Sequence, residues 1–190
     1  AFLRRTPKRG QLPEQPPVTC MTQVLDHTSP ADRSSLRNPA ADGILVGLAG
    51  LHGVLLLLWP GMLLVGLGLW WNANTISHYF IHRPFFRSAT ANVAFSVFLS
   101  LLLGLPQSVW RDRHLAHHAG TEPRIRRTPQ LWIEVAAVGT LWLLILVWSP
   151  WFFLLAWLPG LAIGLSICAV HGHFEHIDTG TTSHYGRIYN

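Results

Sequence analysis

Charged side chains are scarce in this 190-residue chain, at 12% of all residues, whereas an average soluble domain carries about 25%. Hydrophobic residues make up 49% of the chain, and they gather in long uncharged runs between short charged stretches. Such a pattern is typical of a membrane protein rather than of a soluble domain.

Cysteine is also rare, and its two positions exclude whole classes of small protein. Cys20 lies in a polar segment and Cys168 lies in an apolar run, far away in the sequence. Neither a disulfide framework nor a zinc ribbon follows from such a pair. The formal net charge of +5 is compatible with nucleic-acid binding in principle, but the basic residues fit membrane topology better, and we expect no nucleic-acid partner.

Residues 1–42 are polar and rich in proline, without an apolar period of either kind. We predict a mostly disordered tail there and a single membrane domain over residues 43–190. The chain starts at Ala1 rather than at methionine and stops at Asn190 without a polar tail. We therefore expect a fragment that is truncated at both ends.

Two long apolar stretches carry helix breakers near their middles, at Pro60-Gly61 and at Ser149-Pro150. Each stretch is either one kinked helix or a hairpin of two helices. The first arm is short for a membrane span of about 20 residues, and a start nearer Pro39 would lengthen it. The hairpin interpretation predicts helices over Ile44–Leu58, Met62–Ser77, Leu131–Trp148 and Trp151–Val170, with a kink in the last one near Pro159.

The basic residues decide between the two interpretations. No Arg or Lys lies between Asn38 and His82, and none lies between Thr128 and Gly186. Two hairpins therefore place every basic residue on one side of the membrane, which the positive-inside rule makes the cytoplasmic side. We predict an all-α integral membrane fold with four transmembrane helices in two hairpins. The stretch Ala91–Val109 between the hairpins is predicted to lie at the membrane interface.

Histidine is abundant, with eleven residues, and most of these histidines are grouped. Residues four or three apart on a helix share one face, so each group presents its imidazoles together, and imidazole binds divalent iron, zinc, copper or nickel. The first group reads H-x3-H, the second H-x2-H-H and the third H-x-H-x2-H; they are His78 and His82, then His114, His117 and His118, then His171, His173 and His176.

Each group ends a predicted helix or lies in a predicted cytoplasmic segment, so all three groups can converge on one metal site at the cytoplasmic face. Unpaired imidazoles there are costly to bury, and a metal would satisfy them. Two other histidines stand apart. His52, isolated in an apolar run, is expected to pack or to form a local hydrogen bond, and His27 is expected to be solvated.

The order H-x3-H, then H-x2-H-H about 30 residues on, then a hairpin, resembles the membrane fatty-acid desaturase superfamily. That family also includes carotenoid hydroxylases and ketolases and sphingolipid desaturases. The resemblance implies two iron ions, O2 as co-substrate, and a ferredoxin or cytochrome b5-type electron donor. It also implies ligands by motif: His78, His82, His114, His117 and His118, with His171 or His176 at the end of the fourth helix and His173 as an open alternative.

One departure from the family pattern concerns its third box, a second H-x2-H-H, which is absent here. We expect that box shortly beyond Asn190, and we expect this fragment alone to bind metal poorly and to be inactive. Acidic residues have lesser roles. Glu175 and Asp178 are expected to orient a histidine, or less readily to ligate iron, and His184 follows close behind. Asp112 is expected to orient the second box or to form surface ion pairs.

The reaction predicted is O2-dependent desaturation of a fatty acyl chain in a membrane lipid or thioester. Hydroxylation or ketolation of a carotenoid or another hydrocarbon by the same site is the nearest alternative. A zinc-dependent membrane hydrolase is a weaker one, because no H-E-x-x-H string with a catalytic Glu occurs. A b-heme electron carrier needs histidine pairs deep in facing helices, whereas these histidines lie at helix ends.

Overall fold

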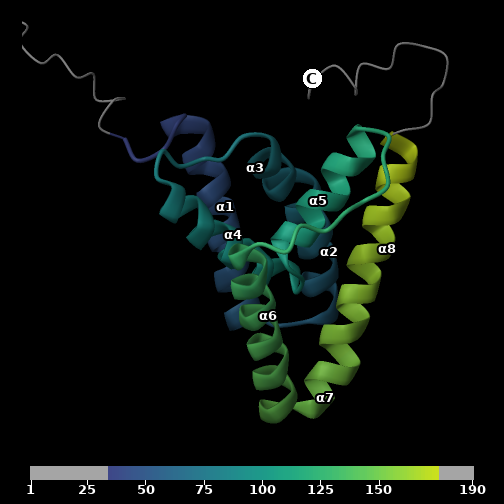
Figure 1. Ribbon diagram of the computed structural model, residues 1–190. Helices are drawn as coiled ribbons and strands as arrows, with labels where there is room; N and C mark the ends of the chain where they lie inside the picture. Colours follow the sequence, from purple (N-terminus) through teal and green to yellow (C-terminus); the bar gives the residue numbers. More distant parts are fainter. Residues whose placement is uncertain (1–33, 176–190) are drawn as a thin grey trace, which may run out of the picture. The chain divides into compact units, whose positions relative to one another are not determined.

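The computed structural model describes residues 34–175, and these residues form helices joined by short turns and one longer loop (Figure 1). Apart from one isolated bridge between Leu36 and Phe86, the described part holds no β-structure. The all-α prediction is therefore confirmed. The elements are α1 Pro39–Leu58, α2 Met62–Asn72, the π-helix η1 Ala73–Ser77, α3 His78–His82, α4 Ala89–Leu103, α5 Gln107–His118, α6 Pro129–Trp148, α7 Pro150–Phe152, the π-helix η2 Phe153–Trp157 and α8 Leu158–Glu175.

The first helix, α1, begins at Pro39, because local groups at its N-terminus satisfy one another. The Asn38 side chain accepts a hydrogen bond from the Ala41 N–H, and the Asp42 carboxylate accepts one from the Asn38 N–H at 2.7 Å. Proline suits the first helical position, since it has no N–H to leave unsatisfied. The resulting helix has 20 residues, about 30 Å at 1.5 Å per residue, which is the length that a span requires.

The predicted second span, Met62–Ser77, differs from the structure in its geometry. After α2 the chain passes through η1 into α3, so the helical path continues to His82 with a π-helical insert. Side-chain amides satisfy carbonyls around that insert, because Asn74 donates to the Trp70 carbonyl at 2.8 Å and Asn72 donates to the Gly68 carbonyl at 3.1 Å. Single π-helical turns inside helices are frequent at functional sites.

The second hairpin turns where the sequence predicts it. Helix α6 ends at Trp148, the Ser149 side chain caps the next turn, and Pro150 is the first residue of α7. The predicted irregularity near Pro159 takes the form of η2, which ends two residues before this proline. Pro159 has no N–H for the carbonyl of Leu155, four residues earlier, so regular α-helical bonding cannot run through this stretch.

Three helices are long and apolar enough to cross a membrane: α1, α6 and the continuous helix Pro150–Phe174. The pair α4 and α5 passes the same test only when taken together, and it bends by 92°. The described part therefore offers three spans, or four if that bent pair is one of them, and α2 is not among them. The chain is a multi-pass membrane protein, and the prediction of four transmembrane helices is confirmed in part.

The bend falls within the stretch predicted to lie at the membrane interface. Ala91–Val109 is divided between two helices, because α4 ends at Gly104 in the left-handed conformation, at φ 66°, and Pro106 caps α5. Glycine adopts that conformation without the strain that a side chain causes. A Cβ at this position would also meet the Leu161 side chain at 2.7 Å.

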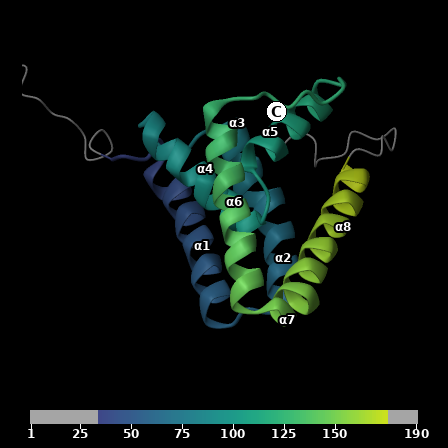
Figure 2. The ribbon, with the colours of Figure 1, turned by 60° about the horizontal axis from the view of Figure 1, so that its bottom comes forward.

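Helix α2 packs closely on α8 through small residues. A Cβ on Gly164 would lie 2.7 Å from the Gly66 carbonyl oxygen, and a Cβ on Gly160 would lie 2.8 Å from the Met62 carbonyl oxygen. Small residues allow such close approach of helix backbones in membranes. Both hairpin turns lie at one end of residues 34–175, and α3 lies at the opposite end with the C-terminal part of α5 (Figures 1 and 2).

Candidate metal centre

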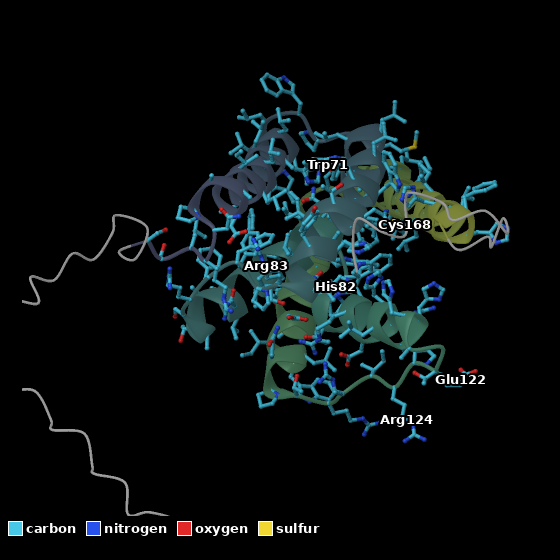
Figure 3. All side chains as sticks on the ribbon, turned by 90° about the horizontal axis from the view of Figure 1, so that it is seen from above. Trp71, His82, Arg83, Glu122, Arg124 and Cys168 are labelled. Carbon is cyan, nitrogen blue, oxygen red and sulfur yellow. The ribbon has the colours of Figure 1, made fainter. Side chains whose placement is uncertain are left out.

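Four imidazoles lie close together, two of them from α3 and two from α5. Their nearest ring nitrogens all lie within 4.8 Å of one another. The Nε2 atom of His114 is 3.1 Å from Nε2 of His82 and 3.0 Å from Nε2 of His118. Viewed from the α3 end, His82 lies close to α5 (Figure 3). We call this group the four-histidine cluster: His78, His82, His114 and His118.

The spacing of these nitrogens fits ligands of one metal ion. A metal–nitrogen bond of about 2.0–2.1 Å, as in zinc sites, places two ligands on one ion about 3.0 Å apart when they subtend a right angle. The two Nε2 separations from His114 match that distance. Neutral imidazole donors suit divalent iron, zinc and copper alike, so the cluster fits a metal centre of the kind that the sequence predicts without selecting iron.

Local helix geometry places the histidines of each pair together. His78 and His82 are the first and last residues of α3, one turn apart, and His114 and His118 are one turn apart on α5. Residues four apart share a helix face. The two faces oppose each other, since the His78 ring centroid lies 4.4 Å from that of His114.

The end of α3 is fixed to the start of α1. The Arg83 guanidinium, directly after the first histidine group, binds the buried Asp42 carboxylate at 2.7 Å. Two backbone hydrogen bonds, from Arg37 N to the Phe85 carbonyl and from Arg87 N to the Ser35 carbonyl, join the same two segments. These contacts hold the segment directly after His82 against the start of α1.

Helix α3 and the charged helix α5 lie outside the three single-helix spans, and one histidine on each, His82 and His114, has a lowered pKa. Burial, together with the positive charge that His78 and His118 would carry if protonated, lowers the pKa of His114 to about 3. Burial, and then His118, also lower the pKa of His82. Because metals bind the neutral imidazole, the imidazoles of His82 and His114 stay available to a metal at mildly acidic pH.

A pocket of about 420 Å³ opens beside the cluster, between η1, α5 and α8. Its wall includes His78 and His114, and the side-chain amide of Asn74 donates a hydrogen bond to Cys168 Sγ at 3.4 Å within it. Asn74 is a site residue that the histidine spacing does not predict, although it lies one helical turn before His78, at the end of an apolar run. Further lining residues are Trp110, Arg113, His117, Cys168 and His173.

The remaining predicted ligands take different positions. The exposed His117 side chain lies outside the four-histidine cluster, with its ring 6.2 Å from that of His118, and faces the pocket. His171 is half-buried, with its ring 6.0 Å from that of Trp70. His173 is exposed and lines the pocket. The Glu175 side chain and the predicted site residues His176, Asp178 and His184 lie outside the described residues.

Asp112 contacts arginines. Its carboxylate accepts hydrogen bonds from Arg111 Nε at 3.1 Å and from the backbone N–H of Arg126 at 2.8 Å, and the Arg126 guanidinium adds two more bonds. Burial acts to raise the pKa of Asp112, but the bonds from Arg126 and Arg111 outweigh it and lower that pKa. The ion pairs therefore tie the loop before α6 to α5, while Glu122 and Arg124 of that loop point outward (Figure 3).

His52 is buried in α1, and its Nδ1 lies 2.6 Å from the Asn72 amide nitrogen. The ring lies against Gly68, where a Cβ would clash with it. This local hydrogen bond agrees with the role predicted for His52 from the sequence. The bond joins α1 to α2, and His52 is not part of the four-histidine cluster.

Comparison with known families supports the assignment of the histidine groups. Residues 54–124 match the family described as fatty acid desaturase, and both histidine groups that form the cluster lie within this match. Among curated proteins and among solved structures, nothing matches the chain significantly. The resemblance drawn from the histidine spacing is confirmed over this stretch.

Proposed function

We propose, from the match of residues 54–124 to the family described as fatty acid desaturase, that the protein is a membrane di-iron oxidoreductase that desaturates a fatty acyl chain with O2. The acyl chain belongs to a membrane lipid or a thioester. The observation that carries this proposal is the meeting of four imidazoles from α3 and α5 within 4.8 Å, inside the matched stretch.

We propose that different histidines of the chain bind each of the two metal ions. His78, His82, His114 and His118 are proposed to hold one ion, since their nitrogens have the spacing of ligands on one centre. His117 faces the adjoining pocket together with His173, and it is proposed to contribute to the second ion with a ligand from the group at the end of α8, His171, His173 or His176. When bound, the two irons supply O2 activation and hydrogen removal from an unactivated C–H bond.

The surroundings suit an apolar substrate at a membrane surface. Several large apolar side chains of α1, α6 and α8 are exposed, as expected for helices that face lipid. Arg113 is exposed beside the pocket, and Arg124 and Arg127 are exposed in the loop before α6. We propose that this arginine-rich face is cytoplasmic and that it receives a ferredoxin or cytochrome b5-type electron donor.

Metal and product analysis of the full-length protein tests the proposal. We expect about two iron ions per chain, and an acyl product that has lost two hydrogens when O2 and reductant are present. The double variant H78A/H114A is expected to lose both. A protein purified with zinc and no iron would contradict the proposal and favour a hydrolase, and a Soret band would favour a heme carrier. An oxygenated carotenoid as the product would retain the centre but change the substrate.

A further inference from the structure

A carboxylate is buried on an otherwise apolar span. Glu134 is the single charged residue of α6, and its side chain has no solvent exposure. A carboxylate is costly to bury in an apolar helix unless its oxygens accept hydrogen bonds. The sequence carries the signal for this site, namely one acidic residue in a 20-residue apolar helix, but the four-histidine cluster does not include it.

Three donors satisfy this carboxylate. Oε1 of Glu134 accepts a hydrogen bond from Ser96 Oγ at 2.7 Å and another from Gln130 Nε2 at 2.9 Å. Oε2 accepts one from the backbone N–H of Ser108 at 2.7 Å. The carboxylate therefore joins α6 to α4 and to the N-terminus of α5.

The bond to Ser108 has the character of a helix cap supplied from another helix. Ser108 is the second residue of α5, and Pro106 at the N-cap position offers no side-chain hydrogen bond. The first N–H groups of a helix have no partner within the helix, and negative charge near them is favourable. Glu134 thus supplies the acceptor that the local sequence of α5 lacks.

The same first turn of α5 is tied to the segment that carries the other ligands. Ser77 Oγ donates to the Gln107 side-chain oxygen at 2.8 Å, and Ser77 directly precedes His78. The Gln107 backbone N–H donates to Ser100 Oγ at 2.8 Å. All of these groups are buried, so the start of α5 is held against η1, α4 and α6 at once.

We propose that Glu134 is a positioning residue of the metal centre. By holding the N-terminus of α5, its carboxylate sets the axial position and the rotation of this helix, and so the place of His114 opposite His82. His114 follows Ser108 by six residues, about 9 Å along the helix, and a small rotation at the start of α5 moves its ring away from α3. This inference rests on the proposed metal centre.

The test is Co²⁺ binding by the full-length protein in detergent micelles, with visible absorption reporting the ligand geometry. The variant E134Q keeps the side-chain volume but replaces one acceptor oxygen with an NH₂ donor. This NH₂ group then faces one of the N–H or O–H donors around it, and that hydrogen bond is lost. We expect Co²⁺ affinity to fall by about 10–100-fold, as for other residues that orient ligands, with a changed Co²⁺ spectrum. Thermal unfolding of the unmodified protein and of E134Q is also measured. Co²⁺ binding is then compared at a temperature where both of these proteins are folded.

The matched control is E122Q, which makes the same chemical change at the exposed Glu122 in the loop before α6 (Figure 3). It is expected to bind Co²⁺ as the unmodified protein does. If E134Q does not fold, E134D serves in its place, since it keeps the charge but withdraws it from Ser108.

Three outcomes would overturn the inference. The first is a folded Glu134 variant with unchanged affinity and spectrum. The second is failure of both E134Q and E134D to fold, because the role would then be one of overall folding. The third is an unmodified protein that binds neither Co²⁺ nor Fe²⁺, which would refute the proposed metal centre as well.

Discussion

The Nε2 atom of His82 lies 3.1 Å from the Nε2 atom of His114, although 32 residues separate the two in sequence. His82 ends the helix that follows the first hairpin, and His114 lies on α5, beyond the 92° bend. His114 also lies 3.0 Å from His118. The contact with His82 joins α5 to α3, and the contact with His118 lies within α5, so the His114 imidazole takes part in both short distances.

Replacement of His114 with alanine is expected to weaken metal binding more than removal of a histidine outside the cluster. The variant H114A removes the ligand nearest to both His82 and His118, and we expect at least about a 100-fold loss in Fe²⁺ or Co²⁺ affinity, at the upper end of losses seen for a group supporting a metal site. Isothermal titration of the metal-depleted protein measures it. H27A, the same change in the polar N-terminal segment, is the control, and equal affinities of the two variants would contradict the cluster.

The stability of the metal-free protein is expected to fall as the pH is lowered below neutrality. The pKa of His114 drops from its ordinary 6.5 to about 3 in the folded protein, mainly through burial, and the pKa of His82 is lowered as well. The unfolded chain then binds more protons than the folded one between pH 6.5 and about 3, so protons favour unfolding in that range and the effect vanishes above it.

Thermal unfolding in micelles at a series of pH values measures this dependence. The variant H114Q, whose side chain does not titrate, is expected to have a shallower decline between pH 6.5 and 4 than the unmodified protein has. An identical slope in the two proteins would show that another group causes the loss of stability.

Enlargement of Gly164 is expected to disrupt the contact between α2 and α8. A Cβ there would lie 2.7 Å from the Gly66 carbonyl oxygen and 3.0 Å from a Leu69 side-chain carbon, so G164V must push backbone away from backbone. We expect a loss of about 1–3 kcal/mol, the usual range for overpacking. G139A on α6 is the control, because a Cβ on Gly139 meets nothing within 4 Å. Unfolding in mixed micelles compares the two variants.

Neutralisation of Asp112 is expected to loosen the loop between α5 and α6. D112N removes the charge that binds the Arg126 guanidinium and weakens the acceptor for the Arg126 N–H at 2.8 Å. Hydrogen exchange of residues 119–128 is expected to become faster. The exposed carboxylate of Glu122 provides the control E122Q, and equal exchange in D112N and E122Q would show that the ion pairs do not order the loop.

Several features of the fold and of the centre follow from local sequence alone. Helix breakers at Pro60-Gly61 and at Ser149-Pro150 set the two hairpin turns, because proline has no N–H to donate within a helix. The spacing of His78 and His82, and of His114 and His118, places each pair on one face of a helix because four residues make about one turn. The grouping of the histidines also predicts a metal site, since imidazole is a common ligand of divalent metals.

Tertiary structure alone decided which of these faces meet. The bend after Gly104 turns α5 back toward α3, and it brings four of the five histidines of the two groups together while His117 faces the pocket. The buried acceptor for the start of α5 comes from Glu134, 26 residues beyond Ser108. Such contacts depend on helix packing and on hydrogen-bond partners far away along the chain, whereas periodicity and spacing report only what lies within a turn or two of each residue.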